Sequence, residues 1–521
     1  MALLTSCWCT DFALLFIGAF IGVYYFYQKK FKHWDKYKIP HTTPKFPFGD
    51  IGLTTINENI VISLDRIYKS FPKEKVVGLW SFFQPILIAR DAGVIKDILV
   101  KDFMNFHDRG IPVDEENDPL SAHLFSLGGS KWRNLRAKLS PTFTSGKMKM
   151  MFPILVQTGN EMPKILEPKA ANKETVEMKD ILSRFTTDII ASCAFGIDSN
   201  SLKDPNVEFR TMGKKITEPT LGNVLRNLVF LVPKMAKALK IRIFPADMSD
   251  FFLNLVRETI DYREKNNVKR NDFMQLLIQL KNKGTLDDVD EIKAKLDNVE
   301  SNEEEKKTVQ TFSVEEAAAQ AFLFFIAGFE TSSTTMIFAL YELALHPEIQ
   351  EKLRNEIKKD LAKNNGEITY EAVFGNEYLG NVVDETLRKY PVAGLLLREC
   401  NKDYKVPNSD MVIPKGTSIQ VPIYSLHYDP KYFPDPQRFD PDRFKEEVKS
   451  QRHRYAYLPF GEGPRNCIGM RFGLMQTRVG LVQLILNYKF EICEKSPVPL
   501  KFSNVSLTPK EGMHLRVSKL N

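Results

Sequence analysis

The chain has 521 residues, of which 43% are hydrophobic and 26% are charged. This composition is typical of a globular protein with a large core and excludes a disordered chain or a small disulfide-stapled scaffold. The net charge of +7 is spread along the chain, so no nucleic-acid-binding surface is indicated. The six cysteines form no CxxC pair, and only Cys7 and Cys9 are close together, which favours free thiols in a reducing compartment.

The N-terminus carries an uncharged apolar segment, FALLFIGAFIGVYYFY, from Phe12 to Tyr27. Its terminal aromatic residues and the lysines that follow are typical of a membrane anchor. A cleaved signal peptide is the alternative, but it would carry its positive charge before the apolar segment, where this chain has Asp11. We therefore predict an anchor over residues 1–28, with the N-terminus in the lumen and the body in the cytoplasm.

Residues 29–52 are basic at first and then rich in proline, with Pro40, Pro44 and Pro47. Because proline fixes the backbone and cannot continue a helix, residues 39–52 are predicted to be a stiff, non-helical connector. A single catalytic domain is expected over residues 53–521.

Residues 75–91, KVVGLWSFFQPILIARD, have the β-branched and aromatic residues of a β-hairpin, and helical patterns dominate from there to Pro391. Residues 224–244 mix apolar and basic residues around Pro233. They predict either a second contact with the membrane interface or two ordinary amphipathic helices. Residues 282–308 lack aromatic residues and are predicted to be a solvated loop or frayed helix.

The sequence SVEE at residues 313–316 is a capping box, and the apolar pattern after it continues to Pro347. At ~1.5 Å per residue it predicts one buried helix roughly 50 Å long. Within it, AGFET at residues 327–331 places an acid, Glu330, and a hydroxyl, Thr331, among apolar residues. An unpaired carboxylate is costly there, although the Thr331 hydroxyl could simply bond to the preceding turn.

The sequence PFGEGPRNCIG, residues 459–469, precedes a second apolar helix. Its glycines allow the backbone to approach a flat ligand, and amides before a helix can donate hydrogen bonds to an anionic sulfur. The helix dipole and Arg465 are expected to lower the pKa of Cys467. A buried inert cysteine is the alternative, but it would not explain the glycines and the arginine.

Together these motifs resemble those of the cytochrome P450 family. Its haem loop, F-x-x-G-x-R-x-C-x-G, is matched in full by Phe460, Gly463, Arg465, Cys467 and Gly469. The resemblance implies that Cys467 is the axial thiolate ligand of the iron in haem b, iron protoporphyrin IX, and favours O–O cleavage. It also implies that Arg465 pairs with a haem propionate and that Phe460 packs beside the sulfur.

The AGFET sequence is similar to the family motif A/G-G-x-D/E-T. The resemblance implies that the helix bulges over the haem at Ala327 and Gly328 to make room for O2. It further implies that Glu330 and Thr331 organise proton delivery.

Glu385 and Arg388 stand at i and i+3 in DETLRKYP, a spacing that usually indicates a surface ion pair of only ~0.3 kcal/mol. In the family this E-x-x-R pair is joined by an arginine from a later P-E/D-R-F motif. We assign Arg443 of FDPDRF to that place, with Arg438 of DPQRF as a competitor. The resemblance implies that the three residues lock the loop that carries Cys467.

Two haem carboxylates require cations. Trp132 and Arg136 lie one helical turn apart and match the family's W-x-x-x-R, while Arg398 stands where the family has another propionate arginine. Arg109 in FHDRG is a fainter match. The basic face of the Trp132 helix either docks an acidic electron donor or is an ordinary solvated face: Lys131, Arg133 and Lys138.

The resemblance implies a mainly α (α+β) fold with a small β-rich region and the haem between the long helix and the cysteine loop. It implies NADPH-dependent insertion of one atom of O2 into a lipophilic substrate, whether a xenobiotic, insecticide, plant toxin, hormone or fatty acid. NADPH–cytochrome P450 reductase is the expected flavoprotein donor, and cytochrome b5 is a candidate second donor. The anchor and RNCIGMRF are closest to insect members of family six, which implies the endoplasmic reticulum membrane.

Two alternatives are a haem-thiolate isomerase or dehydratase that acts on peroxides, and a non-catalytic haem-binding protein. Glu330 and Thr331 argue against both, because neither function needs a proton-delivery pair. Apolar segments are expected to line a pocket for a hydrophobic substrate: residues 106–127, the central helix near Phe325 and Phe329, residues 392–396 and the turn near Ser506.

Overall fold

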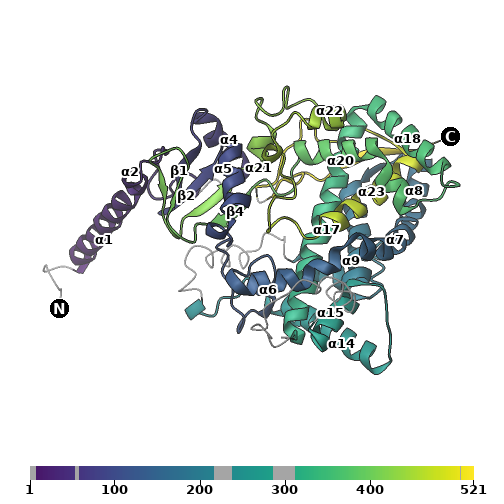
Figure 1. The fold of residues 1–521 in the computed structure, drawn as a ribbon, viewed down its shortest axis with the longest axis horizontal. Coiled ribbons are helices and arrows are strands. Elements are labelled where there is room, and N and C mark those ends of the chain that lie inside the picture. The colour runs from purple at the N-terminus through teal and green to yellow at the C-terminus, as the bar shows by residue number, and fades with distance from the viewer. Residues whose placement is uncertain (1–7, 53–57, 216–236, 285–310, 505, 521) are drawn as a thin grey trace, which may run out of the picture.

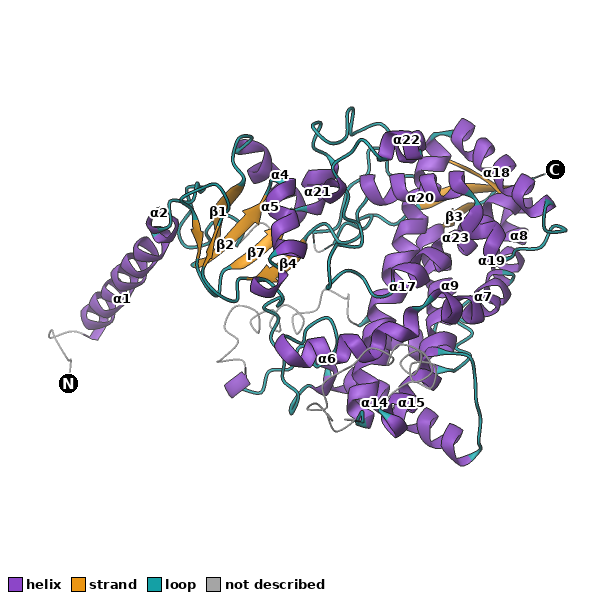
Figure 2. Cartoon of the chain, viewed as in Figure 1, coloured by secondary structure: helices purple, strands orange, loops and turns teal. Residues whose placement is uncertain are grey.

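The computed structural model describes residues 8–52, 58–215, 237–284, 311–504 and 506–520. It is mainly helical with small β-sheets, which confirms the expected fold class (Figures 1 and 2). The largest sheet lies next to the N-terminal helix, and the helical bundle lies beyond it (Figure 2). Most of residues 224–244 and nearly all of 282–308 lie outside the described residues.

Helix α1, Trp8–Phe31, extends away from the body (Figure 1) and is long and apolar enough to cross a membrane. Most of its large apolar side chains are exposed. Its C-terminal half contacts the body. Phe20 and Tyr27 pack against Phe46 at ring centroid distances of 5.8 and 5.1 Å, and Phe31 packs against Trp80 at 5.7 Å. The apolar helix therefore continues past residue 28 into the folded body.

Residues 39–52, which follow α1 and a short helix, form hydrogen bonds with the sheet and do not form a separate connector between anchor and body. After the short helix α2, His33–Lys36, residues 39–52 are non-helical, as predicted. Their backbone bonds to the first strand: Gly78 N–H donates to Pro40 and Asp50 N–H donates to Trp80, both at 2.8 Å. Trp34 is fully buried.

The predicted hairpin is confirmed as β1, Val76–Ser81, paired antiparallel with β2, Gln84–Ala89. Strand β7, Ser418–Val421, adds parallel to β2, and β4, Leu396–Glu399, closes the sheet antiparallel to β7. The sheet thus joins residues about 330 positions apart and places Arg398 on β4. The shorter strands are β3 Thr175–Glu177, β5 Tyr404–Lys405, β6 Val412–Ile413, β8 Tyr488–Glu491 and β9 His514–Lys519.

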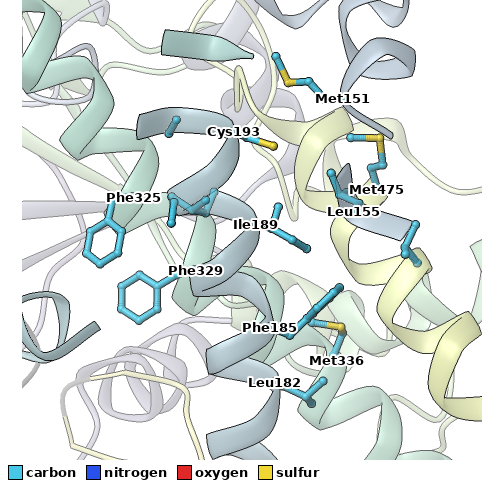
Figure 3. Close-up of a cluster of buried hydrophobic side chains, with 14 of the residues drawn as sticks. Met151, Leu155, Leu182, Phe185, Ile189, Cys193, Phe325, Phe329, Met336 and Met475 are labelled. Carbon is cyan, nitrogen blue, oxygen red and sulfur yellow. The ribbon is translucent and has the colours of Figure 1, made fainter. Parts of the chain in front are cut away.

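The predicted long helix is confirmed as α17, Val314–Leu345, whose 32 residues start at the expected capping box of Ser313 and Glu316. It also satisfies the length and hydropathy of a membrane span, but most of it is buried. It packs against α9, Met178–Ile190, and α23, Met470–Asn487. Figure 3 shows the apolar side chains that fill this contact.

The other α-helices are α4 Ile60–Ser70, α5 Ala92–Lys96, α6 Gly129–Leu139, α7 Ser145–Gly159, α8 Glu161–Ala171, α10 Glu208–Lys214, α14 Ala246–Lys265, α15 Phe273–Lys283, α18 Pro347–Ala362, α19 Tyr370–Gly375, α20 Glu377–Lys389, α21 Ile423–His427 and α22 Glu446–Lys449. Short 3₁₀ turns lie at Phe103–Asn105, Pro119–Ser121, Ser140–Phe143, Pro441–Phe444 and Arg454–Ala456, and π turns at Asp97–Lys101 and Ala191–Phe195.

Candidate active site

A cavity of about 330 Å³ is lined by α17 on one side and by residues 459–469 on the other. Ten of the residues singled out from the sequence line it: Arg109, Trp132, Arg136, Ala327, Gly328, Thr331, Phe460, Arg465, Cys467 and Gly469. Gly463, Glu330 and Arg398 do not line it.

The cysteine loop is held in a tight turn. The N–H of Cys467 donates to the carbonyl of Phe460 at 2.8 Å. Gly463 has a φ of +77°, and a Cβ there would lie 2.0 Å from the carbonyl oxygen of Leu99, so glycine is required. Cys467 precedes α23, and the backbone N–H of Gly469 at the start of that helix favours the anionic form of its sulfur. Cys467 lines the cavity, so its accessible surface faces this protein-enclosed space while the residue itself lies deep in the protein.

The pKa of the Cys467 thiol is raised, because burial outweighs the opposing effects of the Gly469 N–H, Arg136 and Arg109. The helix end lowers this pKa as expected, through the N–H of Gly469, but the net pKa is raised and Arg465 is not among the groups that lower it. The guanidinium of Arg465 lies over the ring of Trp132, 4.3 Å from its centroid. The thiolate therefore requires a further positive charge at the sulfur.

Two of the predicted arginines tie the cavity wall to the loop backbone. Arg136 donates to the carbonyl of Asn466 at 3.0 Å and to its side-chain oxygen at 2.8 Å. Arg109 donates to the carbonyl of Phe125 at 2.8 Å and to that of Arg465 at 3.3 Å. These bonds orient both guanidinium groups without neutralising their charge.

The cavity is surrounded by an excess of buried positive charge. Burial and neighbouring arginines lower the pKa of Arg465 to about 9 and that of Arg109 well below its usual value, and burial lowers that of Arg398 to about 10. Among the described residues, the one carboxylate within ion-pairing distance of these arginines and Arg136 is Asp108, whose Oδ1 lies 3.8 Å from Arg465. The Nε atoms of Arg398 and Arg465 have no partner in the described structure.

Ala327 and Thr331 are exposed towards the cavity from α17. The helix is regularly α-helical through these residues, with no break at the position of the expected bulge. A Cβ on Gly328 would lie 2.4 Å from Cδ1 of Ile190, so this glycine allows α9 to approach. The Thr331 hydroxyl donates to the carbonyl of Ala327 at 2.5 Å and so keeps its lone pairs available on the cavity side.

Glu330 lies away from the cavity. Its carboxylate is 3.6 Å from Nζ of Lys179 on α9, and its side chain is 26% exposed. The acid and the hydroxyl of the AGFET motif therefore have different surroundings, because adjacent residues on a helix point about 100° apart.

The central helix near Phe325 and Phe329 lines the pocket, as expected, but these two side chains do not. Their rings stack at 4.9 Å, and both are buried in an aromatic cluster that includes Phe252 of α14, 5.0 Å from Phe325. Figure 3 shows them on the opposite side of α9 from Met475. Leu323 and Phe324 line the cavity instead, whereas Ser506 does not.

The predicted structural residues form a buried ion cluster. Nε and an Nη of Arg388 donate to the two carboxylate oxygens of Glu385 at 2.7 and 2.8 Å, and both side chains have no exposed surface. Nε of Arg443 lies 3.5 Å from Glu385. Arg438 is exposed and offers only its carbonyl to Arg388, at 3.2 Å. The third place in the cluster is therefore taken by Arg443.

His427 connects this cluster to the cysteine loop and carried no signal in the sequence. Its Nε2 accepts the N–H of Leu458 at 3.0 Å, so its Nδ1–H donates to the carbonyl of Arg388 at 3.1 Å. Burial and the charge of Arg388 lower the pKa of His427 to about 3, so the ring is neutral. Asn466 and Gln476 also line the cavity but were not singled out from the sequence. The only signal in the sequence was a polar side chain next to other residues of the loop or of α23.

Comparison with known proteins identifies the same family that the sequence motifs resemble. Residues 40–516 match the family model described as Cytochrome P450. The chain belongs to the cytochrome P450 family. It is 40% identical to the probable cytochrome P450 6a14 of Drosophila melanogaster over 98% of this chain and 100% of the relative. It is 41% identical to cytochrome P450 6k1 of Blattella germanica over 97% and 96%. These relatives are insect members of family six, as the motifs predicted.

Members of this family are generally haem-thiolate monooxygenases. The residues present fit that cofactor. Two propionates would supply the negative charge that Arg109, Arg136, Arg398 and Arg465 lack, and an iron cation would supply the positive charge that the thiol of Cys467 lacks. A Cβ on Gly469 would have no neighbour closer than 4.0 Å, so the loop leaves room for a flat ligand.

We predict that Glu385→Gln strongly destabilises the folded protein, by about 3–5 kcal/mol, because it leaves Arg388 buried without its counter-charge. The midpoint of thermal unfolding and the fraction of haem retained after gel filtration measure the effect. Arg443→Ala should lower the same midpoint, whereas Arg438→Ala should not, because the Arg438 side chain is exposed. Equal losses in these two variants would contradict the assignment.

The low pKa of His427 predicts a specific acid sensitivity. The unfolded chain binds a proton at this residue near its ordinary pKa of 6.5, but the folded chain does so only near 3. The free energy of unfolding should therefore decrease as the pH falls from about 6.5 towards 3. His427→Gln should reduce this slope in urea unfolding, whereas substitution of the exposed His453 by glutamine should leave it unchanged. An unaltered slope in His427→Gln would refute the assignment.

Proposed function

We propose that this cytochrome P450 is an NADPH-dependent monooxygenase of the endoplasmic reticulum membrane that hydroxylates lipophilic substrates. The balance of the reaction is RH + O2 + NADPH + H⁺ → ROH + H2O + NADP⁺. The observation that carries the proposal is that Cys467 and Thr331 of α17 line the same cavity. A non-catalytic haem-binding protein would not need a hydroxyl at that position.

Each side chain would have a separate task. Cys467 would bind the iron of haem b, and Arg109, Arg136 and Arg465 would hold the propionates, with Arg398 adding positive charge behind them. The bound haem supplies the activation of O2. Phe460 would pack beside the cysteine, and the tight turn at Gly463 keeps the loop in its conformation.

Protons would enter along α17. Thr331 lines the cavity, and its hydroxyl proton is bonded to the carbonyl of Ala327. The hydroxyl would therefore accept a hydrogen bond on the cavity side and would rotate to return a proton there. Glu330 is partly exposed beside Lys179 and would take up protons from solvent on the other side of the helix. The small residues Ala327 and Gly328 would leave the surface of α17 next to Thr331 without bulky side chains.

The substrate would be lipophilic because the cavity wall is mainly apolar. Leu124 and Phe125 from the predicted loop line it, together with Val392, Ala393 and Leu396 from the predicted segment before β4. Such a wall excludes water and gives few hydrogen bonds to a substrate. Whether the substrate is a xenobiotic, an endogenous lipid or a hormone depends on the shape of the cavity rather than on these residue types.

The electron donor would be NADPH–cytochrome P450 reductase, with cytochrome b5 as a second donor. The basic face of α6 is the proposed docking surface. Lys131 already pairs with Glu115 at 2.7 Å, whereas Arg133 has the sulfur of Met104 as its contact, at 3.2 Å. Arg133 is therefore the better placed of the two to meet an acidic partner.

Helix α1 would insert into membrane lipid and hold the catalytic domain on the cytoplasmic side. Its exposed apolar side chains and the lysines at its C-terminal end support this orientation. The packing of Tyr27 against Phe83 in the turn between β1 and β2, and of Phe31 against Trp80 on β1, would then fix the sheet end of the body close to the membrane surface.

The proposed reaction is tested with the full chain, purified reductase, NADPH and ¹⁸O2, using an alkoxycoumarin and a medium-chain fatty acid as probes. We expect NADPH-dependent product in which the fatty acid gains one ¹⁸O atom. Conversion of a hydroperoxide without NADPH or reductase, with no ¹⁸O incorporation, would instead support an isomerase or dehydratase.

We predict that Thr331→Val lowers the product formed per NADPH by on the order of tenfold and increases the release of hydrogen peroxide, because the proton-holding hydroxyl is lost. Thr334→Val is the matched control. Thr334 is buried on the same helix, does not line the cavity, and its hydroxyl has no partner in the described structure. Equal loss of coupling in both variants would contradict the role of Thr331.

A further inference from the structure

The N-terminus of α6 is capped by a carboxylate from another segment of the chain. The N-cap residue of α6 is Gly128, which has no side chain to accept a hydrogen bond. The acceptor is Asp108, whose Oδ1 binds the backbone N–H of Gly129 at 2.7 Å. A Cβ on Gly128 would lie 2.8 Å from the same oxygen, so the glycine allows the carboxylate to approach. A negative charge at this end of a helix is favourable, because the helix dipole is positive there.

Helix α6 carries two side chains of the site. The ring of Trp132 lies against the guanidinium of Arg465, 4.3 Å from its centroid. Arg136, one turn further along, donates to the carbonyl of Asn466 at 3.0 Å. The start of α6 therefore determines where both side chains meet the cysteine loop.

Asp108 is also bound to the end of strand β4. Its carbonyl accepts the N–H of Glu399 at 2.8 Å, and its Oδ2 accepts the side-chain N–H of Asn401 at 2.9 Å. Glu399 directly follows Arg398 in β4, and Arg109 directly follows Asp108 in its own segment. One carboxylate thus connects the segments that carry Arg109 and Arg398 with the helix that carries Arg136.

The Asp108 side chain keeps its negative charge beside the arginines. Burial favours a higher pKa for this carboxyl group, but the Gly129 N–H, His107 and Asn401 together hold the pKa below its ordinary value. Nδ1 of His107 lies 2.7 Å from Oδ1, and an Nη of Arg465 lies 3.8 Å from it. The carboxylate therefore offsets part of the positive charge of this wall.

We propose that Asp108 is a positioning residue for haem, which holds α6 and β4 in register and adds one fixed negative charge next to the arginines. The proposal rests on the haem binding of the proposed function. Because the three connected segments are fixed by the protein itself, their arginines are oriented before any propionate arrives. A negative charge near the iron favours its more positive oxidation state, so Asp108 is expected to lower the reduction potential.

The charge is tested with Asp108→Asn in the full, haem-loaded chain, by spectroelectrochemical titration of the ferric–ferrous potential. Asparagine keeps an oxygen for the Gly129 N–H but removes the charge, and the partnerless Oδ1 of Asn401 can turn to accept from the new amide. We expect the potential to shift in the positive direction. A site that was only loosened would admit water and shift the potential in the negative direction.

Asp91→Asn is the matched control for the charge. Asp91 caps the neighbouring helix α5 through the N–H groups of Gly93 and Val94, at 2.9 and 3.2 Å, and does not line the cavity. Its substitution should leave the potential unchanged. An unchanged or negative potential shift in Asp108→Asn, or an equal positive shift in Asp91→Asn, would overturn the proposed charge effect.

The positioning is tested with Asp108→Ala, which removes both the charge and the cap. Transfer of haem to apomyoglobin should become about fivefold faster than in the wild type, as expected for the loss of one helix cap. Amide hydrogen exchange of residues 129–133 should also accelerate in Asp108→Ala, but not in Asp108→Asn. Asp91→Ala should accelerate exchange only in α5. Unchanged exchange in α6, or equal haem loss in Asp91→Ala, would refute the positioning role.

The two proposals fail in different ways. If the wild type binds haem but forms no ¹⁸O-labelled product from the probes, while Asp108→Asn shifts the potential in the positive direction, the proposed function fails and the role of Asp108 stands. If the product forms and neither the potential nor the haem transfer changes in the Asp108 variants, only the inference about Asp108 fails.

Discussion

Buried positive charge beside one thiol is the constraint on which the site depends. Arg109, Arg398 and Arg465 have depressed pKa values because the protein places them together in a desolvated wall with little negative charge. In the same cavity, burial raises the pKa of Cys467. A ligand that carries two carboxylates and a metal cation removes both penalties at once, and haem is such a ligand. The rest of the fold holds these arginines and Cys467 in place although their burial is electrostatically unfavourable.

A series of buried polar contacts connects the loop that carries Cys467 to the helical bundle. Glu385 and Arg388 form a bidentate ion pair, and His427 links the backbone of that helix to Leu458 at the start of the loop. Buried ion pairs contribute little net stability, but they are strongly directional because breaking one leaves an uncompensated charge. This explains why a pair whose i, i+3 spacing is typical of a helix surface occurs in the core. We propose that its role is to define one position for the loop.

The sequence predicted the elements whose signal is local. The capping box at Ser313 and the apolar run after it located α17, and the glycines with Arg465 marked the loop of Cys467. Side-chain direction was less accessible, because it depends on which neighbour packs on each helix face. Phe325 therefore faces other aromatic rings rather than the cavity. Glu330, next to Thr331 in sequence, faces Lys179. The raised pKa of Cys467 likewise follows from burial, which the loop sequence does not encode.

The most direct test of this account is the absorption spectrum of the detergent-solubilised protein, reduced with dithionite, with and without carbon monoxide. It should be recorded for the wild type and for Cys467→Ala. A strongly red-shifted Soret band in the wild type and its loss in the variant are predicted, because a thiolate ligand of iron produces that shift. A band typical of histidine-ligated haem in folded wild-type protein, or a red-shifted band that persists in Cys467→Ala, would contradict the central claim.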